Sequence, residues 1–553
     1  MGDKKVIDGK IFEKIVTNGA LNLKANLQEV NDLNVFPIPD GDTGDNMFMT
    51  INGGLPFLKK EESNALYLKA KALANGMLLN ARGNSGVILS QLFNGLAIGL
   101  ENKETASINE FGLAFKNGVK QAYSSVVQPV EGTILTVARE AAEYAYEHID
   151  ENSTLDTFIT DYVSEMKHSL DRTPELLYVL KEAGVVDSGG AGFLKVAEGM
   201  LMAVQGKLLE LNVQDEEKTA SNAQANFDTK DIKFGYCTEF ILILKDPANF
   251  EEGDLRSPLS IIGDSLVLVQ DEDLVKVHVH TNNPGRALNM AQRHGDFKTI
   301  KIENMRLQHT ELISGDKAAE AAKPEVKETV STEKKKIALI AVCFGDGVKE
   351  TFTELGVDHI IDGGQTMNPS TEEFVKAVNS LNAENIIIIP NNSNVIMSAM
   401  QTKELCEGVN IEVIRTKNIC HGYSALFAFD ETNSLEENAK AMSEAIKNVK
   451  AGEITFAVRD TEIKGVKIKN GDFMGILNDE IIISTPERAD AVKDVLEKSI
   501  DEETQIITFF YGLGVEVDEV NELVEYAQSL NEDAEVTVIN GQQDIYSYII
   551  SVE

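Results

Sequence analysis

Closely spaced acidic residues and glycines in the run 40–45 (DGDTGD) directly follow the apolar, proline-containing segment 35–39. Asp40 and Asp42 are separated by one glycine, and residues i and i+2 of an extended backbone point the same way, so both carboxylates can reach one ion. Such hard oxygen ligands suit Mg²⁺, which shares its coordination shell with waters and phosphate oxygens. A solvated Asp/Gly turn and a Ca²⁺ loop are the alternatives, but no EF-hand ligand spacing follows in the sequence.

Further segments place glycine and small polar residues at the start of apolar helices. They are 82–86 (RGNSG), 131–133 (EGT) and 187–192 (DSGGAG). A helix N-terminus favours an anion, because its first backbone N–H groups are free and the helix dipole is positive there. Each segment alone is also explained as a helix cap. Together with the Asp loop, they predict a phosphate site that has neither P-loop nor GxGxxG spacing.

The elements that must position these segments are helical. Apolar residues recur at i, i+3, i+4 and i+7 in the segments 66–81, 86–100, 133–146, 155–170 and 192–204. We therefore expect residues 1–210 to form one all-α domain. The polar segment 211–230 that follows is expected to be a linker.

The remaining sequence changes to strand character. Strand-like runs at 240–244, 265–270 and 274–280, with a helix at 285–293, predict a small α/β domain over 231–313. Residues 314–336 are rich in Ala, Glu, Lys, Ser and Thr and cannot bury an apolar face, which predicts a flexible tether. Alternating strands and helices over 337–553 predict a parallel α/β sheet flanked by helices, with further strands at 454–462, 506–511 and 535–539.

Polar loops follow two of the strands in this last domain. The segments 363–370 (GGQTMNPS) and 390–394 (PNNSN) lie where ligands bind in an open α/β sheet. Ordinary strand-to-helix connections with helix caps explain them equally well. We expect Cys343, Cys406 and Cys420 to be core residues.

A second candidate metal site lies in the middle domain. His278 and His280 alternate in a strand-like run and therefore project from one face, and Cys237 begins another strand. A cysteine and two histidines that converge across neighbouring strands would suit Zn²⁺. The alternative is a core thiol and two histidines bonded to the backbone, since a single cysteine is usually just buried.

Composition limits the class of protein. A chain of 553 residues is expected to fold as several domains. With 51 Lys and Arg against 89 Asp and Glu, the formal net charge is −38, which disfavours nucleic acid and anionic membranes as partners. The 4 cysteines are few and scattered, and no apolar run is long enough to span a bilayer. These features predict a cytoplasmic protein without membrane insertion.

The quoted motifs resemble those of a known family. LNVFPIPDGDTGDNM, ARGNSGVILSQLFNGLA and DSGGAGFL are similar to the DhaL-type kinase domain of dihydroxyacetone kinases. Over its whole length the chain resembles the FakA family, the ATP-binding subunits of bacterial fatty acid kinase. The resemblance implies an all-α DhaL-type helical barrel, a small α/β middle domain and an α/β DegV-like, FakB-like C-terminal domain.

The resemblance also implies site residues. Asp40 and Asp42 would bind Mg²⁺ and act as the catalytic residues, and Asn34 would be a further Mg²⁺ ligand. Asp45 departs from the family pattern and is expected to be a helix cap. Zn²⁺ would be bound by Cys237, His278 and His280. The ATP site would comprise Thr43, Gly44, Asn46, Asn84, Ser85, Gly86, Thr133, Arg172, Asp187 and Gly189.

The implied activity is ATP-dependent phosphorylation of a fatty acid that a separate FakB-type protein of the DegV family presents. The product would be an acyl phosphate, and the family suggests a homodimer. The C-terminal domain would be a partner-docking or regulatory domain, with a degenerate lipid-binding domain as the alternative. Two alternatives remain: a small-polyol kinase of the dihydroxyacetone type, and a non-catalytic nucleotide- or lipid-sensing scaffold. The intact Asp40 and Asp42 count against the scaffold.

Overall fold

The computed structural model describes residues 3–34, 41–209, 236–245, 263–271, 274–281, 284–304, 334–364 and 368–553, with a few positions between 247 and 259. The chain forms two compact units: Met1–Leu211 with Val330–Glu553, and Asn212–Thr329. The predicted linker 211–230 and most of the predicted tether 314–336 lie outside the described residues.

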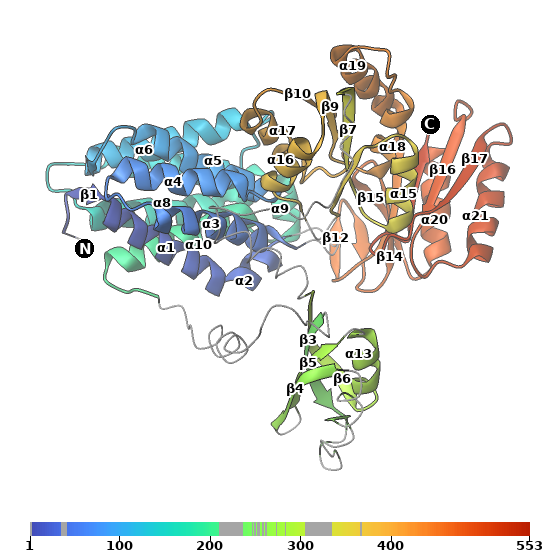
Figure 1. The fold of residues 1–553 in the computed structure, drawn as a ribbon, viewed down its shortest axis with the longest axis horizontal. Coiled ribbons are helices and arrows are strands. Elements are labelled where there is room, and N and C mark those ends of the chain that lie inside the picture. Colours follow the sequence, from blue (N-terminus) through green and yellow to red (C-terminus); the bar gives the residue numbers. More distant parts are fainter. Residues whose placement is uncertain are drawn as a thin grey trace, which may run out of the picture. The chain divides into compact units, whose positions relative to one another are not determined.

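Long helices that lie side by side form the N-terminal part of the first unit (Figure 1). Short strands β1 (Val6–Asp8) and β2 (Thr105–Ser107) pair antiparallel at one end of these helices. The helices are α1 (Gly9–Ala25), α2 (Leu27–Asp32), α3 (Thr43–Lys60), α4 (Leu66–Leu79), α5 (Gly83–Gly99), α6 (Ile108–Ser125), α7 (Ile134–Glu147), α8 (Leu155–Leu176), α9 (Tyr178–Ala183) and α10 (Ser188–Val204).

One apolar core joins these helices. The rings of Phe111, Phe115 and Phe158 meet edge to face, with centroids 5.1 Å apart for Phe111–Phe115 and 5.5 Å for Phe115–Phe158. Helices α1 and α10 approach closely at Gly199, where an added Cβ would lie 2.6 Å from the backbone oxygen of Asn18. The apolar residues that recur along each helix thus face one shared core, which makes these helices a single domain.

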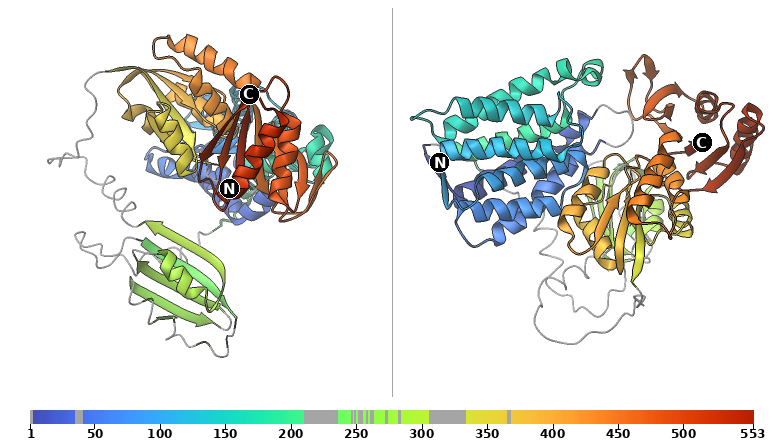
Figure 2. Two further views of the ribbon diagram at one scale, coloured as in Figure 1. Left: turned by 90° about the vertical axis from the view of Figure 1, so that its right-hand side faces the viewer. Right: turned by 90° about the horizontal axis from the view of Figure 1, so that it is seen from above.

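The described part of the second unit contains a sheet with helix α13 (Pro284–Ala291) against it. Strands β3 (Tyr236–Leu244), β4 (Gly263–Asp271), β5 (Leu274–Thr281) and β6 (Gly295–Asn304) pair antiparallel in the order β4-β5-β3-β6. Helix α13 lies against this sheet (Figure 2), and its Ala287 and Ala291 belong to the same apolar core as the buried valines of β5.

The C-terminal part of the first unit begins with a parallel sheet of order β10-β9-β7-β8. Successive residues of β7 belong to two apolar cores, Leu339 to one and Ile340 to the other, so helices cover both faces. The elements are β7 (Lys335–Cys343), α15 (Asp346–Glu354), β8 (His359–Asp362), α16 (Thr371–Ser380), β9 (Ala383–Ile389), α17 (Ile396–Leu405), β10 (Asn410–Val413), α18 (Ile419–Phe427) and α19 (Leu435–Ala445).

A second, mainly antiparallel sheet follows, in the order β15-β14-β11-β18-β16-β17. Only its β16–β17 pair is parallel among the described strands. Helices α20 and α21 pack on it. The elements are β11 (Lys450–Phe456), β12 (Thr461–Ile463), β13 (Val466–Ile468), β14 (Phe473–Leu477), β15 (Glu480–Thr485), α20 (Arg488–Ser499), β16 (Ile506–Tyr511), α21 (Val517–Leu530), β17 (Glu535–Asn540) and β18 (Tyr548–Val552).

The predicted single strand 454–462 is wrong. Strand β11 ends at Phe456, and β12 begins at Thr461. The Asp460 carboxylate accepts a hydrogen bond of 2.7 Å from the backbone N–H of Asn470, which closes the base of the hairpin formed by β12 and β13. Within the described residues, no helix has the length and apolar character needed to cross a membrane.

Candidate functional site

A cavity of about 480 Å³ lies where the first turns of α3 and α5 face loops of the C-terminal part of the same unit. Its size is that of a small-molecule site. On the helical side it is lined by Asn34, Asp42, Thr43, Asn46, Asn84 and Ser85. On the other side it is lined by Asn392, Ser393, Asn394, Lys417, Glu453, Ile476, Asp479, Ile481 and Tyr546.

The first turn of α3 brings part of the predicted Asp loop to this cavity. Asp42 is the N-cap residue of α3, and its backbone oxygen accepts a 2.8 Å hydrogen bond from the backbone N–H of Asn46. The Asn31 side chain accepts from the N–H of Gly44 at 2.7 Å and donates to the Asp45 carboxylate at 2.7 Å. Asp45 therefore lies in the first turn of α3, where the helix dipole stabilises its negative charge, and it is not among the residues that line the cavity.

The first turn of α5 is fixed against α3 through Thr50. Thr50 is fully buried. Its hydroxyl accepts a hydrogen bond of 3.2 Å from the backbone N–H of Arg82 and donates one of 2.7 Å to the backbone oxygen of Asn46. Gly86 allows this approach, because an added Cβ would lie 2.3 Å from the Thr50 oxygen. Asn84, in the same turn, is thereby placed at the cavity.

The first turns of α7 and α10 lie beside the first turn of α3. The Ser188 hydroxyl lies 3.2 Å from that of Thr43. The neighbouring Asp187 carboxylate accepts a 2.7 Å hydrogen bond from the N–H of Gly190 and a further bond from the backbone of Ile134. Burial raises the pKa of Asp187 to about 6, against the opposing effect of these two bonds.

These bonds join the first turns of α3, α7 and α10. Thr133, the N-cap residue of α7, accepts from the N–H of Leu135. Thr133, Asp187 and Gly189 are not among the residues that line the cavity. The sequence-predicted segments therefore meet at one end of the helical domain, although only some of their side chains reach the cavity.

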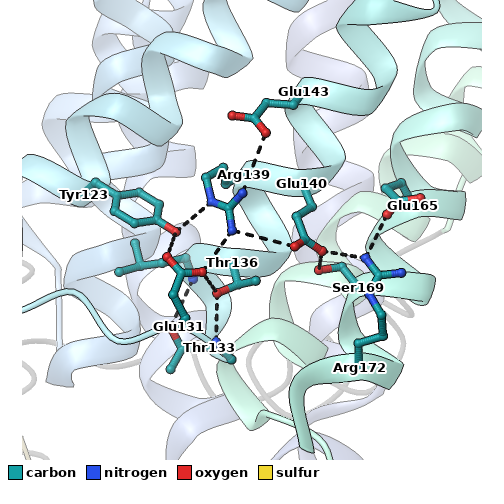
Figure 3. Close-up of polar contacts among 12 residues, drawn as sticks. Tyr123, Glu131, Thr133, Thr136, Arg139, Glu140, Glu143, Glu165, Ser169 and Arg172 are labelled. Atoms are coloured by element: carbon teal, nitrogen blue, oxygen red, sulfur yellow. Dashed lines mark hydrogen bonds and ion pairs between the residues drawn. The ribbon is translucent and has the colours of Figure 1, made fainter. Parts of the chain in front are cut away.

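Arg172 belongs to a polar network on α7 and α8 (Figure 3). Its guanidinium lies 2.6 Å from the Glu140 carboxylate and 3.1 Å from that of Glu165. Arg139 makes a corresponding 2.9 Å ion pair with Glu131. Two carboxylates thus hold the Arg172 cation outside the cavity lining, and its contact with phosphate stays a prediction.

The oxygen atoms at the α3 end of the cavity suit magnesium. Asp42 and Asn34 both line it, and Thr43 adds a hydroxyl oxygen. Asp40 lies outside the described residues. No group of three or more His, Cys, Asp or Glu suited to a metal occurs among the described residues. Mg²⁺ needs only one or two carboxylates beside phosphate and water, so the donors at the cavity fit it.

The predicted zinc ligands lie in the second unit. The register of β3 and β5 places the backbone of Cys237 directly opposite that of His280, and that of Glu239 opposite His278. The side chains of Cys237, His278 and His280 lie outside the described residues. The zinc site therefore stays a prediction that the backbone register permits.

Sequence reasoning missed several polar residues of the cavity, among them Lys417, Glu453 and Asp479. The Lys417 ammonium lies 3.2 Å from the Asp479 carboxylate. Burial, with the nearby Asp479 charge, raises the pKa of Glu453 to about 7. The one local signal on this side of the cavity is the polar loop at 390–394, of which Asn392, Ser393 and Asn394 line it.

Comparison with known families and proteins decides the family. The "DAK2 domain" matches residues 37–202, and the FakA-like middle and C-terminal domains of fatty acid kinase match 233–312 and 338–553. Protein YloV of Bacillus subtilis (strain 168) is 43% identical over 557 residues, covering 99% of this chain and 100% of YloV. The chain belongs to the FakA-like family of fatty acid kinase proteins.

Further relatives of this FakA-like chain agree. A protein of Staphylococcus haemolyticus (strain JCSC1435) is 42% identical over 554 residues and covers 99% of each chain. The family resemblance and the multidomain fold class expected from the sequence are thus confirmed. The DAK2 match makes the helical domain a kinase-type domain.

Two solved structures share only a weak overall likeness with the FakA-like chain. A DegV-family protein from Ruminococcus gnavus ATCC 29149 is 13% identical, with a TM-score of 0.30, and covers 40% of this chain and 100% of its own. The dihydroxyacetone kinase of C. freundii is 13% identical, with a TM-score of 0.29, covering 40% of this chain and 49% of its own. At these scores neither likeness bears on the site.

Proposed function

We propose that this chain transfers the γ-phosphoryl group of ATP to the carboxylate of a fatty acid, which a separate DegV-type (FakB) protein presents. The products are an acyl phosphate and ADP. The observation behind this proposal is that the starts of α3, α5, α7 and α10 adjoin a cavity lined by Asp42. Helix N-termini supply fixed positive potential, which phosphoryl transfer requires in a protein of net charge −38.

In this proposal Asp40, Asp42 and Asn34 hold magnesium, which neutralises charge on the phosphate oxygens when bound. Thr43, Gly44 and Asn46 face the phosphates from α3. Asn84, Ser85 and Gly86 do so from α5. Thr133, Asp187 and Gly189 close on the nucleoside, and Arg172 would have to leave its carboxylate partners to reach a phosphate.

The acceptor chemistry needs little from the protein. A fatty acid carboxylate is already ionised at neutral pH, and so it attacks the γ-phosphorus without a general base. The site must therefore position two anions and reduce their repulsion. This requirement matches the α3 and α5 side of the cavity, where amide, hydroxyl and helix N-terminal groups lie beside Asp42.

The remaining parts of the proposal concern the other domains. Cys237, His278 and His280 would bind Zn²⁺ in the middle domain, and the C-terminal domain would dock the fatty-acid carrier. The protein would act in the cytoplasm as a homodimer. The family membership supports these assignments.

The test incubates the full chain with MgATP and a long-chain fatty acid, with and without a purified DegV-type protein loaded with that fatty acid. Hydroxylamine traps acyl phosphate as a hydroxamate. We expect product only with the partner. Product without the partner would contradict presentation, and turnover of dihydroxyacetone instead of fatty acid would favour the polyol kinase.

A further inference from the structure

The C-terminal domain makes a direct hydrogen bond to the proposed magnesium ligand. The side-chain amide of Asn368 donates to the Asp42 carboxylate at 2.7 Å, although the two residues lie 326 positions apart in the chain. Asn368 is 2% exposed and precedes Ser370, the N-cap residue of α16. The carboxylate that should meet a metal ion is therefore bonded to the C-terminal domain.

The same segment also contacts the start of α5. The Arg82 guanidinium donates to the backbone oxygen of Asn368 at 2.8 Å and lies 3.3 Å from the Glu373 carboxylate. The N–H of Thr371 donates to the backbone oxygen of Ala81 at 3.2 Å. We call these bonds, together with the Asn368–Asp42 bond, the closing contact.

A further bond extends the closing contact to the proposed phosphate turn. The Asn84 amide donates to the Asn394 side-chain oxygen at 3.2 Å. Asn84 is one of the residues assigned to the phosphates, and Asn394 lies in the polar loop after β9. The C-terminal domain thus engages both the metal loop and the phosphate turn of the kinase domain.

The closing contact also buries polar atoms that have no hydrogen-bond partner among the residues that the structure describes. They are the side-chain oxygens of Asn84, Asn368 and Thr371. A buried acceptor without a hydrogen bond is costly, and water would bond to each of these atoms if the surfaces separated. Because water would satisfy these atoms, separating the two surfaces costs less than separating a fully hydrogen-bonded interface.

We propose that the closing contact is autoinhibitory: it occupies the Asp42 carboxylate and the Asn84 amide and must open when magnesium nucleotide binds to them. This inference rests on the proposed function. A metal ion on the same Asp42 oxygen would lie against the positive amide hydrogen of Asn368, so the two compete. Because linkage is reciprocal, nucleotide weakens the closing contact by the same factor by which the contact weakens nucleotide binding.

The first test is calorimetric titration of the full chain with MgADP. The Asn368→Ala and Asn394→Ala variants each remove one closing bond from the C-terminal side. We expect each to bind MgADP about fivefold more tightly than the unmodified chain, a typical coupling between sites. Asn410→Ala is the matched control, because the exposed Asn410 amide bonds to Asn385 and its removal should leave the affinity unchanged.

The second test is hydrogen exchange measured by mass spectrometry on the unmodified chain. The N–H of Thr371 is protected by its bond to Ala81, so a peptide that contains it should exchange faster when MgADP is added. Slower or unchanged exchange would overturn the proposal, even if a substitution had disturbed folding.

The outcomes separate the two proposals. If the unmodified chain binds MgADP and the Asn368 and Asn394 variants bind it equally or more weakly, the autoinhibitory contact is wrong and the kinase proposal stands. If the chain and all variants fail to bind MgADP, the kinase proposal fails, and the autoinhibitory contact fails with it.

Discussion

The hydroxyl groups of Thr43 and Ser188 lie 3.2 Å apart and join the first turn of α3 to that of α10. Thr43 is 7% exposed and lines the cavity, while Ser188 follows the carboxylate that caps α10. The proposed metal loop is thus fixed in place by a helix that begins 145 residues later.

Removing this bond should weaken both the fold and the site. We expect Ser188→Ala to lower the free energy of unfolding by about 1 kcal/mol, the net worth of one hydrogen bond. It should also reduce MgADP affinity about threefold, because Thr43 loses its support. Ser124→Ala, which removes an exposed bond to Gln121 in the same domain, is the control. Equal affinities for both variants would argue against a positioning role for Ser188.

The glycines at two of the helix starts should differ in their tolerance of alanine. A Cβ at Gly86 would meet the buried Thr50 oxygen at 2.3 Å, whereas at Gly189 the nearest atom is 3.3 Å away. We expect Gly86→Ala to lower the free energy of unfolding by about 2 kcal/mol, as overpacking does, and Gly189→Ala by less than about 1 kcal/mol. Urea unfolding measures both, and the reverse order would contradict the packing described here.

Asp187 should make stability depend on pH in the acidic range. Its pKa rises from 3.8 to about 6 on folding, so the folded chain binds the proton more tightly than the unfolded chain. Stability from this group is therefore complete below about pH 4 and is lost as the pH rises to about 6, by about 3 kcal/mol in total.

The Asp187→Asn variant tests this dependence, since asparagine keeps an N-cap oxygen but does not titrate. Urea unfolding at pH 4 and at pH 7 should show a smaller decrease in stability for the variant than for the unmodified chain. Parallel decreases in the two proteins would show that Asp187 does not titrate as described.

Local sequence patterns predicted individual helices and strands, because their signals lie within a short stretch of sequence. The strand expected at 506–511 is β16, and the helix expected at 133–146 is α7 within one residue at each end. The antiparallel second sheet was not predicted, because its pairings join distant segments. In one of them, Lys450 of β11 lies opposite Val552 of β18, and no local pattern records such a partner.

The candidate site divides in the same way. Asp42, Asn84 and Ser85 could be named from sequence because glycine-rich helix starts have a local signature. Lys417, Glu453 and Asp479 could not, since they meet only after two sheets and a domain contact have formed. The ion pairs that hold Arg172 likewise depend on the packing of α7 against α8.

The most direct measurement compares two aspartates of the opening loop. Asp42→Asn and Asp45→Asn each remove one charge from the start of α3, but only Asp42 lines the cavity. With MgATP, a fatty acid and a DegV-type partner, we expect Asp42→Asn to lower hydroxamate formation by about 10²- to 10³-fold and Asp45→Asn to stay within about threefold of the unmodified chain. Undiminished product formation by Asp42→Asn would contradict the claim that this cavity is the site of phosphoryl transfer.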